Sequence, residues 1–378
     1  MHNNYKYIDS DRRFAAYYGD IKGEKIIAVD LEADSMHHFK ERVCLIQLAD
    51  KKNSCVLDPF KIMDFSRLKI LMENRSIKKV FHGSDFDIRS LDREYGIRVN
   101  NLFDTEIACK FLGIKERGLK ALLKKYFNVD QDKKYQKKDW SVRPLPEEML
   151  AYSIIDVLYL IDLAQILTGE LKRKKRLAWA EEEFQRQTEV RYELNNRQYH
   201  FLRFKGAGKM DKKTLAVLEH LLAMRMKIAE KKDLPLFKVL GADQITNIAL
   251  EKPLTLNHLK QTSILTKKQT GMYGEMCIKA VDKALKLDES DMPQYPASKA
   301  RRLKNVEHMR IKYLKIMRRK MSEKYGMEPG FLLNNAMIIK ISVKNPLTKA
   351  ELENIQSIRK WQVEALSDEI FSVLQDYQ

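Results

Sequence analysis

The feature that most constrains this chain is a short stretch in which a predicted buried strand ends in two acidic residues. Residues 25–34 read KIIAVDLEAD, and an apolar run with β-branched members is typical of a buried strand. Side chains alternate across a strand, so Asp30 and Glu32 are expected on one face. Two buried negative charges need a partner of opposite sign, yet no Lys or Arg lies between Lys25 and Lys40. A divalent cation bound through oxygen would meet that need, and a strand that merely runs out into solvent is the alternative.

Strands and helices are predicted to alternate along the next part of the chain. The predicted strands are 43–49, 55–58, 79–83 and 99–103, and the predicted helices are 65–73, 84–95, 104–112, 119–127 and 147–167. The short polar turn after residue 49 indicates an antiparallel pair, whereas a strand reached across a helix normally returns parallel. The order therefore predicts a mixed α/β sheet.

The C-terminal half is predicted to be helical and duplicated. Pro235 and Pro329 are 94 residues apart, and Pro253 and Pro346 are 93 apart. Duplication of an all-α module is the simplest explanation, and chance similarity is the alternative. The predicted segments are an α/β domain at 1–170, a charged helical connector at 171–207, a helical module at 208–286, a linker at 287–297 and a second helical module at 298–378.

The composition favours a polyanionic partner inside the cell. Lys and Arg number 70 against 52 Asp and Glu, a formal net charge of +18. A basic protein with an acidic cluster suits a nucleic acid cut at a metal site, although solubility or binding to anionic lipid would also use such charge. The four Cys lack zinc-site spacing, which indicates reduced thiols. No signal peptide and no run near the ~18 apolar residues of a membrane span are found, so a cytoplasmic protein without membrane contact is expected.

A second acidic position occurs where a predicted strand gives way to a helix. Residues 82–87 read HGSDFD and end at Asp87. The structural alternative is a capping box formed by Ser84 and Asp87, with Asp85 favourable at the helix N-terminus.

A third acidic position lies in a helix that is apolar almost all round. Asp156 is expected to be largely buried there, and Tyr152, one turn earlier, shares its face. The structural alternative pairs Asp156 with a buried Arg or Lys. Asp30, Glu32, Asp87 and Asp156 together carry a formal charge of −4, which two Mg²⁺ or Mn²⁺ ions would neutralise. Such a pair of ions activates water and stabilises the leaving oxygen of a phosphodiester, and Tyr152 is expected to orient the water.

These residues resemble the motifs of ribonuclease D, in the DEDD superfamily of 3′ to 5′ exonucleases. Asp30-Leu31-Glu32 is similar to the first motif, Asp87 to the second and Tyr152-x-x-x-Asp156 to the third, and the tyrosine marks the DEDDy branch. The segment 132–145 is the most specific match. The helical modules resemble HRDC domains, the nucleic-acid-binding units of ribonuclease D and RecQ-type helicases, with the copy at 212–285 clearer than the copy at 298–374.

The resemblance implies an RNase H-like (DEDD exonuclease) catalytic domain followed by two all-α HRDC-like domains. It further implies two-metal hydrolysis from an RNA 3′ end with release of 5′-mononucleotides. Four acidic residues would bind metal and Tyr152 would position the water. Asp85 is a rival for the second motif, but the family spacing from His82 favours Asp87. Gln136 and Arg143 are expected to contact substrate.

A dense basic run between residues 301 and 320 includes Arg318 and Arg319, which are expected to contact phosphates. A solvated helix face is the alternative there. The predicted function is trimming of tRNA precursors or other structured RNA with 3′ extensions by a monomeric enzyme. A DNA exonuclease and a catalytically silent RNA-binding protein are the alternative functions.

Overall fold

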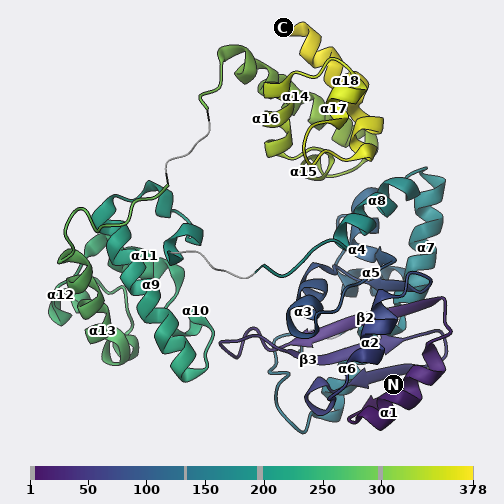
Figure 1. The fold of residues 1–378 in the computed structure, drawn as a ribbon, viewed down its shortest axis with the longest axis horizontal. Coiled ribbons are helices and arrows are strands. Elements are labelled where there is room, and N and C mark those ends of the chain that lie inside the picture. Colours follow the sequence, from purple (N-terminus) through teal and green to yellow (C-terminus); the bar gives the residue numbers. More distant parts are fainter. Residues whose placement is uncertain (1–4, 132–133, 194–198, 297–300, 378) are drawn as a thin grey trace. The chain divides into compact units, whose positions relative to one another are not determined.

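The computed structural model describes residues 5–131, 134–193, 199–296 and 301–377 (Figure 1). The chain divides into two compact units. Unit 1 comprises residues 1–33, 43–192 and 301–378, and unit 2 comprises residues 34–42 and 193–300. The predicted boundary at residues 297 and 298 lies outside the described residues. The five-segment division of the sequence therefore stays a prediction.

Unit 1 contains a six-stranded mixed sheet with the order β1-β4-β3-β2-β5-β6. The strands are β1 (Lys6–Ile8), β2 (Ile26–Ala33), β3 (Val43–Ala49), β4 (Ser54–Leu57), β5 (Lys78–Phe81) and β6 (Leu102–Asp104). β3 pairs antiparallel with both β2 and β4, whereas β5 pairs parallel with β2 and β6, and β1 pairs parallel with β4. The predicted mixed α/β fold is confirmed.

Helices cover both faces of this sheet (Figure 1). They are α1 (Asp11–Ile21), α2 (Ser66–Glu73), α3 (Asp85–Tyr95), α4 (Thr105–Leu112), α5 (Leu119–Phe127), α6 (Glu147–Leu158), α7 (Leu160–Arg173) and α8 (Leu177–Gln187). Ile27, Val29 and Leu31 of β2 pack in one core with α1, α2 and α3. Ala28 packs on the opposite face, in the core that includes α4, α6 and α7. The alternation along β2 therefore directs Asp30 and Glu32 towards the α6 side of the sheet.

Three local features differ from the prediction. β1 and α1 were not predicted, and β1 is a three-residue edge strand, too short to show a periodic pattern. The predicted helix 147–167 is broken at Tyr159 into α6 and α7. α8 lies within the predicted connector, but it is packed through Trp179, Ala180 and Phe184, which are all buried.

The segment formed by α6 and α7 corrects the expectation about membrane spans. Within the described residues, 147–173 is one helical stretch long and apolar enough to cross a membrane. In the structure α6 contacts β2, β3 and β4, while α7 contacts β2, β5 and α4. Its apolar side chains, such as Ile154 and Leu163, are buried in the core. The hydrophobicity of this segment is thus explained by its place against the sheet.

Two helical modules follow, and their elements correspond one to one. The first has α9 (Lys212–Lys232), α10 (Leu236–Val239), α11 (Ala242–Glu251), α12 (Leu256–Gln261) and α13 (Lys267–Leu285), and the second has α14 (Asn305–Tyr325), α15 (Pro329–Leu332), α16 (Asn335–Lys344), α17 (Lys349–Glu353) and α18 (Lys360–Asp376). α9 and α14 each have 21 residues, and α11 and α16 each have 10. Lys252 and Asn345 end the latter pair in the left-handed conformation, each directly before a proline. The predicted internal repeat is confirmed.

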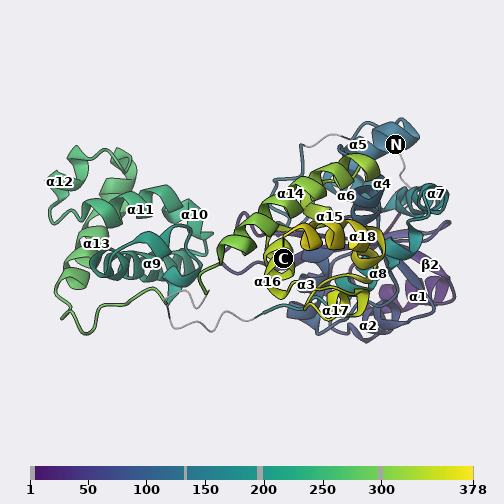
Figure 2. The same cartoon turned by 90° about the horizontal axis from the view of Figure 1, so that it is seen from above.

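The second module shares a hydrophobic core with the sheet domain of unit 1. Trp361 at the start of α18 stacks on Trp179 of α8, with ring centroids 5.7 Å apart, and meets Phe111 of α4 edge-on at 5.1 Å. In Figure 2, α14 runs beside α16 and α18, and it contacts both of them as well as α15. The contact is also polar, because the Glu182 carboxylate accepts hydrogen bonds from the backbone N–H groups of Lys360 and Trp361, both at 2.9 Å.

We predict that the Glu182→Ala substitution lowers the free energy of unfolding by about 1 kcal/mol, because it leaves the first N–H groups of α18 without acceptors. Urea denaturation monitored by tryptophan fluorescence measures the change. Glu181→Ala is the control, since Glu181 is exposed on the same helix and lacks this contact. Equal stability of the two variants would contradict the assignment of Glu182 as the cap of α18.

Candidate active site

The first part of the site is the end of β2, in the middle of the sheet. β2 lies between β3 and β5, with Asp30 opposite Gln47 and Glu32 opposite Leu45. The register shifts between Glu32 and Ala33, where the strand ends. Both carboxyls are partly buried and point to the side of the sheet covered by α6. A central strand flanked on both sides holds these two side chains in fixed positions.

α6 supplies the other half of the acidic group. Asp156 lies on this helix, which packs against β2, and Tyr152 is one turn earlier on the same face. Asp30, Glu32 and Asp156 each offer a carboxylate oxygen, and these three oxygens lie within 4.8 Å of one another. Residues 126 positions apart in the sequence therefore meet as the sequence analysis predicted.

Asp87 lies beside this group but outside it. It is buried in the first turn of α3, with 6% of its surface exposed. It does not belong to the group of oxygens within 4.8 Å, but its charge raises the pKa of both Asp30 and Glu32. The four carboxylates of Asp30, Glu32, Asp87 and Asp156 together form the acidic site.

The capping box that was the structural alternative for this region is not formed, although Asp85 lies in the first turn of α3 as that alternative expected. The Ser84 side chain does not cap α3, because its hydroxyl donates to Asp104 at 2.7 Å. Asp85 points elsewhere and forms an ion pair with Arg89 at 2.9 Å. The geometry therefore favours Asp87 over Asp85 as the neighbour of the other carboxylates.

The pKa values of Asp30 and Glu32 are set by burial and by the neighbouring negative charges. Burial raises the pKa of both carboxyls well above their ordinary values, and the charges of Asp156 and Asp87 raise them further. Because each negative charge disfavours the others, the cluster is unfavourable when every carboxyl is ionised and no cation is bound.

Burial also raises the pKa of Asp87 and Asp156. Burial raises the pKa of Asp87 to about 7, and the charge of Asp104 contributes. Burial raises the pKa of Asp156 to about 6, although a hydrogen bond from Gln131 lowers it. In the described part of the chain, no Lys, Arg or His forms an ion pair with any carboxylate of the acidic site. Closely spaced carboxylate oxygens without a protein cation fit a hard divalent ion.

Tyr152 is held by two aromatic neighbours. Its ring centroid lies 5.7 Å from that of Tyr135 and 6.2 Å from that of Trp140, which is buried. The segment before α6 therefore fixes the tyrosine at the edge of the acidic site.

A cavity of about 940 Å³ opens at the acidic site. Asp30, Glu32, Tyr152 and Asp156 line it, as does Gln136, which the sequence predicted as a substrate contact. Lys120 and Lys124, four residues apart on α5, and Gln131 line it as well, and the sequence analysis did not single them out. Only their helical spacing could have shown that the two lysines share a face.

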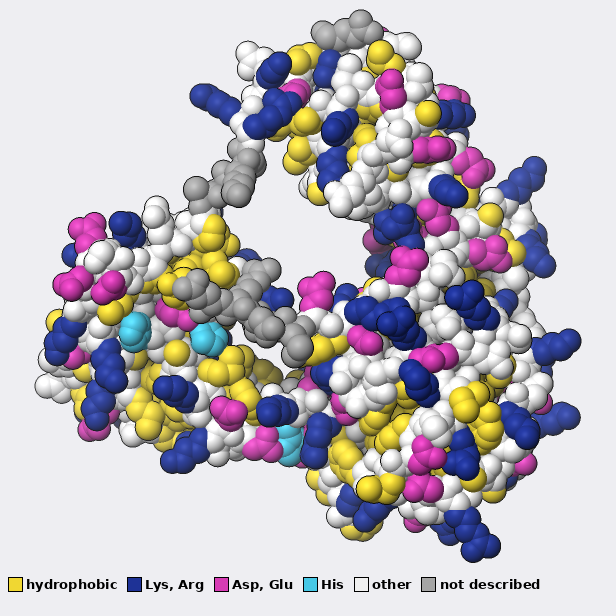
Figure 3. Space-filling view, in the orientation of Figure 1, with side chains coloured by type: hydrophobic (Ala, Val, Ile, Leu, Met, Phe, Trp, Pro, Cys, Tyr) yellow, Lys and Arg dark blue, Asp and Glu magenta, His cyan; other side chains and the backbone are white. Residues whose placement is uncertain are grey.

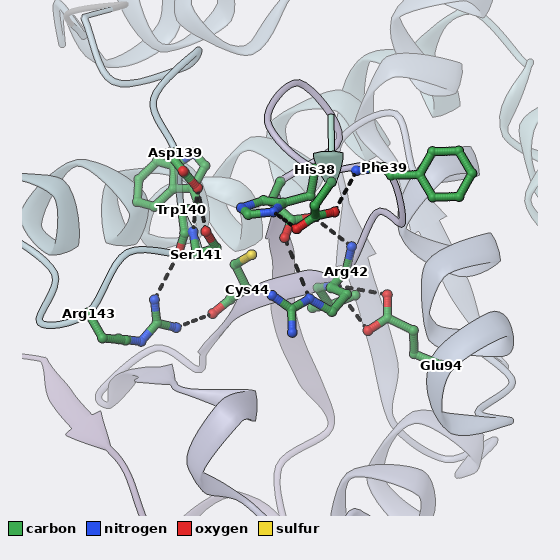
Figure 4. Close-up of polar contacts among 12 residues, drawn as sticks. His38, Phe39, Arg42, Cys44, Glu94, Asp139, Trp140, Ser141 and Arg143 are labelled. Carbon is green, nitrogen blue, oxygen red and sulfur yellow. Dashed lines mark hydrogen bonds and ion pairs between the residues drawn. The ribbon is translucent and has the colours of Figure 1, made fainter. Parts of the chain in front are cut away.

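Arg143 has an internal role that the sequence analysis missed. Its guanidinium forms a bidentate pair with the buried Asp58, at 2.6 and 2.8 Å. Figure 4 shows it also donating to the carbonyl groups of Cys44 and Trp140, both at 2.8 Å. Together with a bond to the Val142 carbonyl, these contacts occupy all five N–H groups. The geometry therefore gives Arg143 a structural role, and its contact with substrate stays a prediction.

The basic run in the second module is not one free surface. Arg318 is half-buried and donates to the Leu333 carbonyl at 2.7 Å, and Arg310 is buried and donates to the Tyr377 carbonyl. Arg319 is exposed and pairs with Glu323 at 3.8 Å. Figure 3 shows that Lys and Arg side chains are spread over the visible face and interspersed with Asp and Glu. Phosphate contact by Arg318 and by Arg319 stays a prediction.

Known proteins are similar to this chain both in the sheet domain and in the two helical modules. A family profile described as 3′-5′ exonuclease matches residues 5–172, and the HRDC domain profile matches residues 214–281 and 307–374. Ribonuclease D of Desulfotalea psychrophila is 28% identical over 352 residues, 92% of this chain and 93% of that protein. Ribonuclease D of Bartonella henselae is 27% identical over 348 residues, 91% of this chain and 84% of that protein. The crystal structure of Escherichia coli RNase D, an exoribonuclease involved in structured RNA processing, aligns with a TM-score of 0.73 at 25% identity over 99% of both chains.

We predict that Mn²⁺ binds more tightly as the pH rises. A cation binds the ionised carboxylates, so protons must be released from Asp156, with a pKa of about 6, and from Asp87, with a pKa of about 7. Asp30 and Glu32 release protons as well, since burial raises the pKa of both well above its ordinary range. Affinity should rise about tenfold per pH unit for each proton released, between pH ~5.5 and ~7.5. Calorimetry at several pH values, in buffers of different ionisation enthalpy, measures both the affinity and the number of protons. A pH-independent affinity would contradict the assignment of these two carboxyls to the ion.

Proposed function

Because the chain belongs to the ribonuclease D family of 3′ to 5′ exoribonucleases, we propose that its acidic site binds two divalent metal ions and that Tyr152 orients the attacking water. The family is metal-dependent, and Mg²⁺ or Mn²⁺ is the proposed ion. The observation that carries the proposal is the meeting of three carboxylate oxygens within 4.8 Å, beside a fourth buried carboxylate.

The ions, when bound, would activate water and stabilise the leaving oxygen of the phosphodiester. The chain's own residues would provide the geometry for that chemistry. The acidic site holds its oxygens on a central strand and on two helices, which limits their movement. The ring of Tyr152 packs against two aromatic rings, which hold its hydroxyl in place. That hydroxyl would form a hydrogen bond with the attacking water and so orient it. Lys120 and Lys124 on the cavity wall would attract the phosphates of the RNA.

The substrate proposed for this enzyme is structured RNA with a 3′ extension, tRNA precursors among them. Support comes from the relatives, since the E. coli protein is described as acting in structured RNA processing. The two HRDC-type modules and the net charge of +18 are consistent with a polyanionic substrate. We further propose a monomeric enzyme in the cytoplasm, where its four free and buried cysteines would stay reduced.

We predict that Asp30→Asn and Asp156→Asn each lower the rate of RNA degradation by about a hundredfold or more, because each removes a charged oxygen that stabilises the transition state through metal. Digestion of 5′-labelled RNA with Mg²⁺, Mn²⁺ or EDTA measures the rate and shows the direction of degradation. Asp85→Asn is the matched control and should retain activity, since Asp85 pairs with Arg89 at the surface. Activity that persists in EDTA and in both site variants would instead point to a catalytically silent protein with a contaminating nuclease.

A DNA exonuclease is the second candidate, since DEDD enzymes acting on DNA share the carboxylates. We predict faster turnover of single-stranded RNA than of DNA of the same sequence, in line with the relatives' names. Replacing single riboses near the 3′ end with 2′-deoxyribose localises any contact to a 2′-hydroxyl. Equal or faster degradation of DNA would favour the second candidate.

A further inference from the structure

Gln131 is a buried polar residue beside the acidic site, and none of the motifs above includes it. Its side chain is 6% exposed, and its amide nitrogen Nε2 donates to Asp156 Oδ1 at 2.6 Å. Within the described residues, Asp156 is the one carboxylate of the acidic site that accepts a hydrogen bond from another side chain. The contact joins the loop after α5 to α6 and lies within the cavity wall.

We propose that Gln131 is a positioning residue for metal binding: its amide fixes the orientation of the Asp156 carboxylate and leaves Oδ2 to face the cation. This inference rests on the proposed function, because it requires Asp156 to be a ligand. A carboxylate with one oxygen held by a donor cannot rotate freely about its terminal torsion, so less conformational freedom is lost when the ion binds. Partners of this kind typically change metal affinity by about 10- to 100-fold.

The chemistry of an amide suits this task better than that of a charged donor. An Arg or Lys at the same place would neutralise Asp156 and compete with the cation for its charge. The Nε2 group of Gln131 supplies a hydrogen bond without a net charge, so the carboxylate keeps its charge for the ion. The opposite orientation of the amide would place Oε1 against a carboxylate oxygen, and two acceptors repel.

The same segment also holds the other functional side chain of α6. Tyr135 and Trp140 pack on the ring of Tyr152, while Gln131 binds Asp156 one turn further along the helix. Gln131, Tyr135 and Trp140 therefore support both proposed functional groups of α6, and Arg143 is anchored to Asp58. In this arrangement these residues between α5 and α6 orient the third motif.

The test compares Gln131→Leu, which keeps the approximate size but removes the donor, with the unaltered protein. Mn²⁺ affinity is measured by calorimetry and by electron paramagnetic resonance of free Mn²⁺, without RNA. We expect the affinity to fall about 10- to 100-fold. In the assay with RNA, kcat should recover at high Mn²⁺ while KM for RNA stays unchanged, a pattern that general destabilisation would not give.

Gln362→Leu is the matched control. Gln362 is similarly buried, at 8%, and its Nε2 also donates a single hydrogen bond, to the Leu332 carbonyl at 2.8 Å in the second module. Unchanged affinity in Gln131→Leu, or equal loss in both variants, would overturn the proposal. Asp156→Asn separates the two levels of the argument. If Asp156→Asn loses Mn²⁺ binding and Gln131→Leu does not, the metal site stands and the positioning role fails; if Asp156→Asn binds Mn²⁺ normally, the proposed function itself fails.

Discussion

The site depends on one constraint: the packing of α6 against the central strand β2 holds several carboxylates close together. β2 and α6 pack together because their apolar residues form one core, and that packing brings Asp30 and Glu32 close to Asp156. The pKa of each of these carboxyls is raised, so the fold tolerates the cluster at a cost in stability. A site that is unfavourable in the free protein and favourable with a cation is a common property of functional sites.

The sheet domain and the second helical module share one hydrophobic core. Trp361 reaches the core through Trp179 and Phe111, and Glu182 satisfies the first N–H groups of α18. The two modules thus share their helical order but differ in their surroundings, since the first belongs to a separate compact unit.

Some of the basic residues that give the chain its positive charge bind groups within the protein itself. Part of the basic excess is internal: Arg143 is bound to Asp58, and Arg310 and Arg318 hold carbonyl groups within the second module. Guanidinium groups suit that role because their planar array of donors can satisfy several acceptors at once. Lys120 and Lys124 are less conspicuous in the sequence, but they line the same cavity as Asp30, Glu32 and Asp156.

The sequence by itself determined the mixed sheet, the duplicated modules and the meeting of Asp30 and Glu32 with Asp156, because apolar periodicity and motif spacing are local properties of the chain. It did not determine that Ser84 binds Asp104 instead of capping its helix, that Arg143 is fully engaged, or that Gln131 holds Asp156. These hydrogen bonds join residues that are 1 to 99 positions apart in the sequence. Only the tertiary structure decided them, because the partner of a buried polar group depends on which segments the folded core brings within about 3 Å.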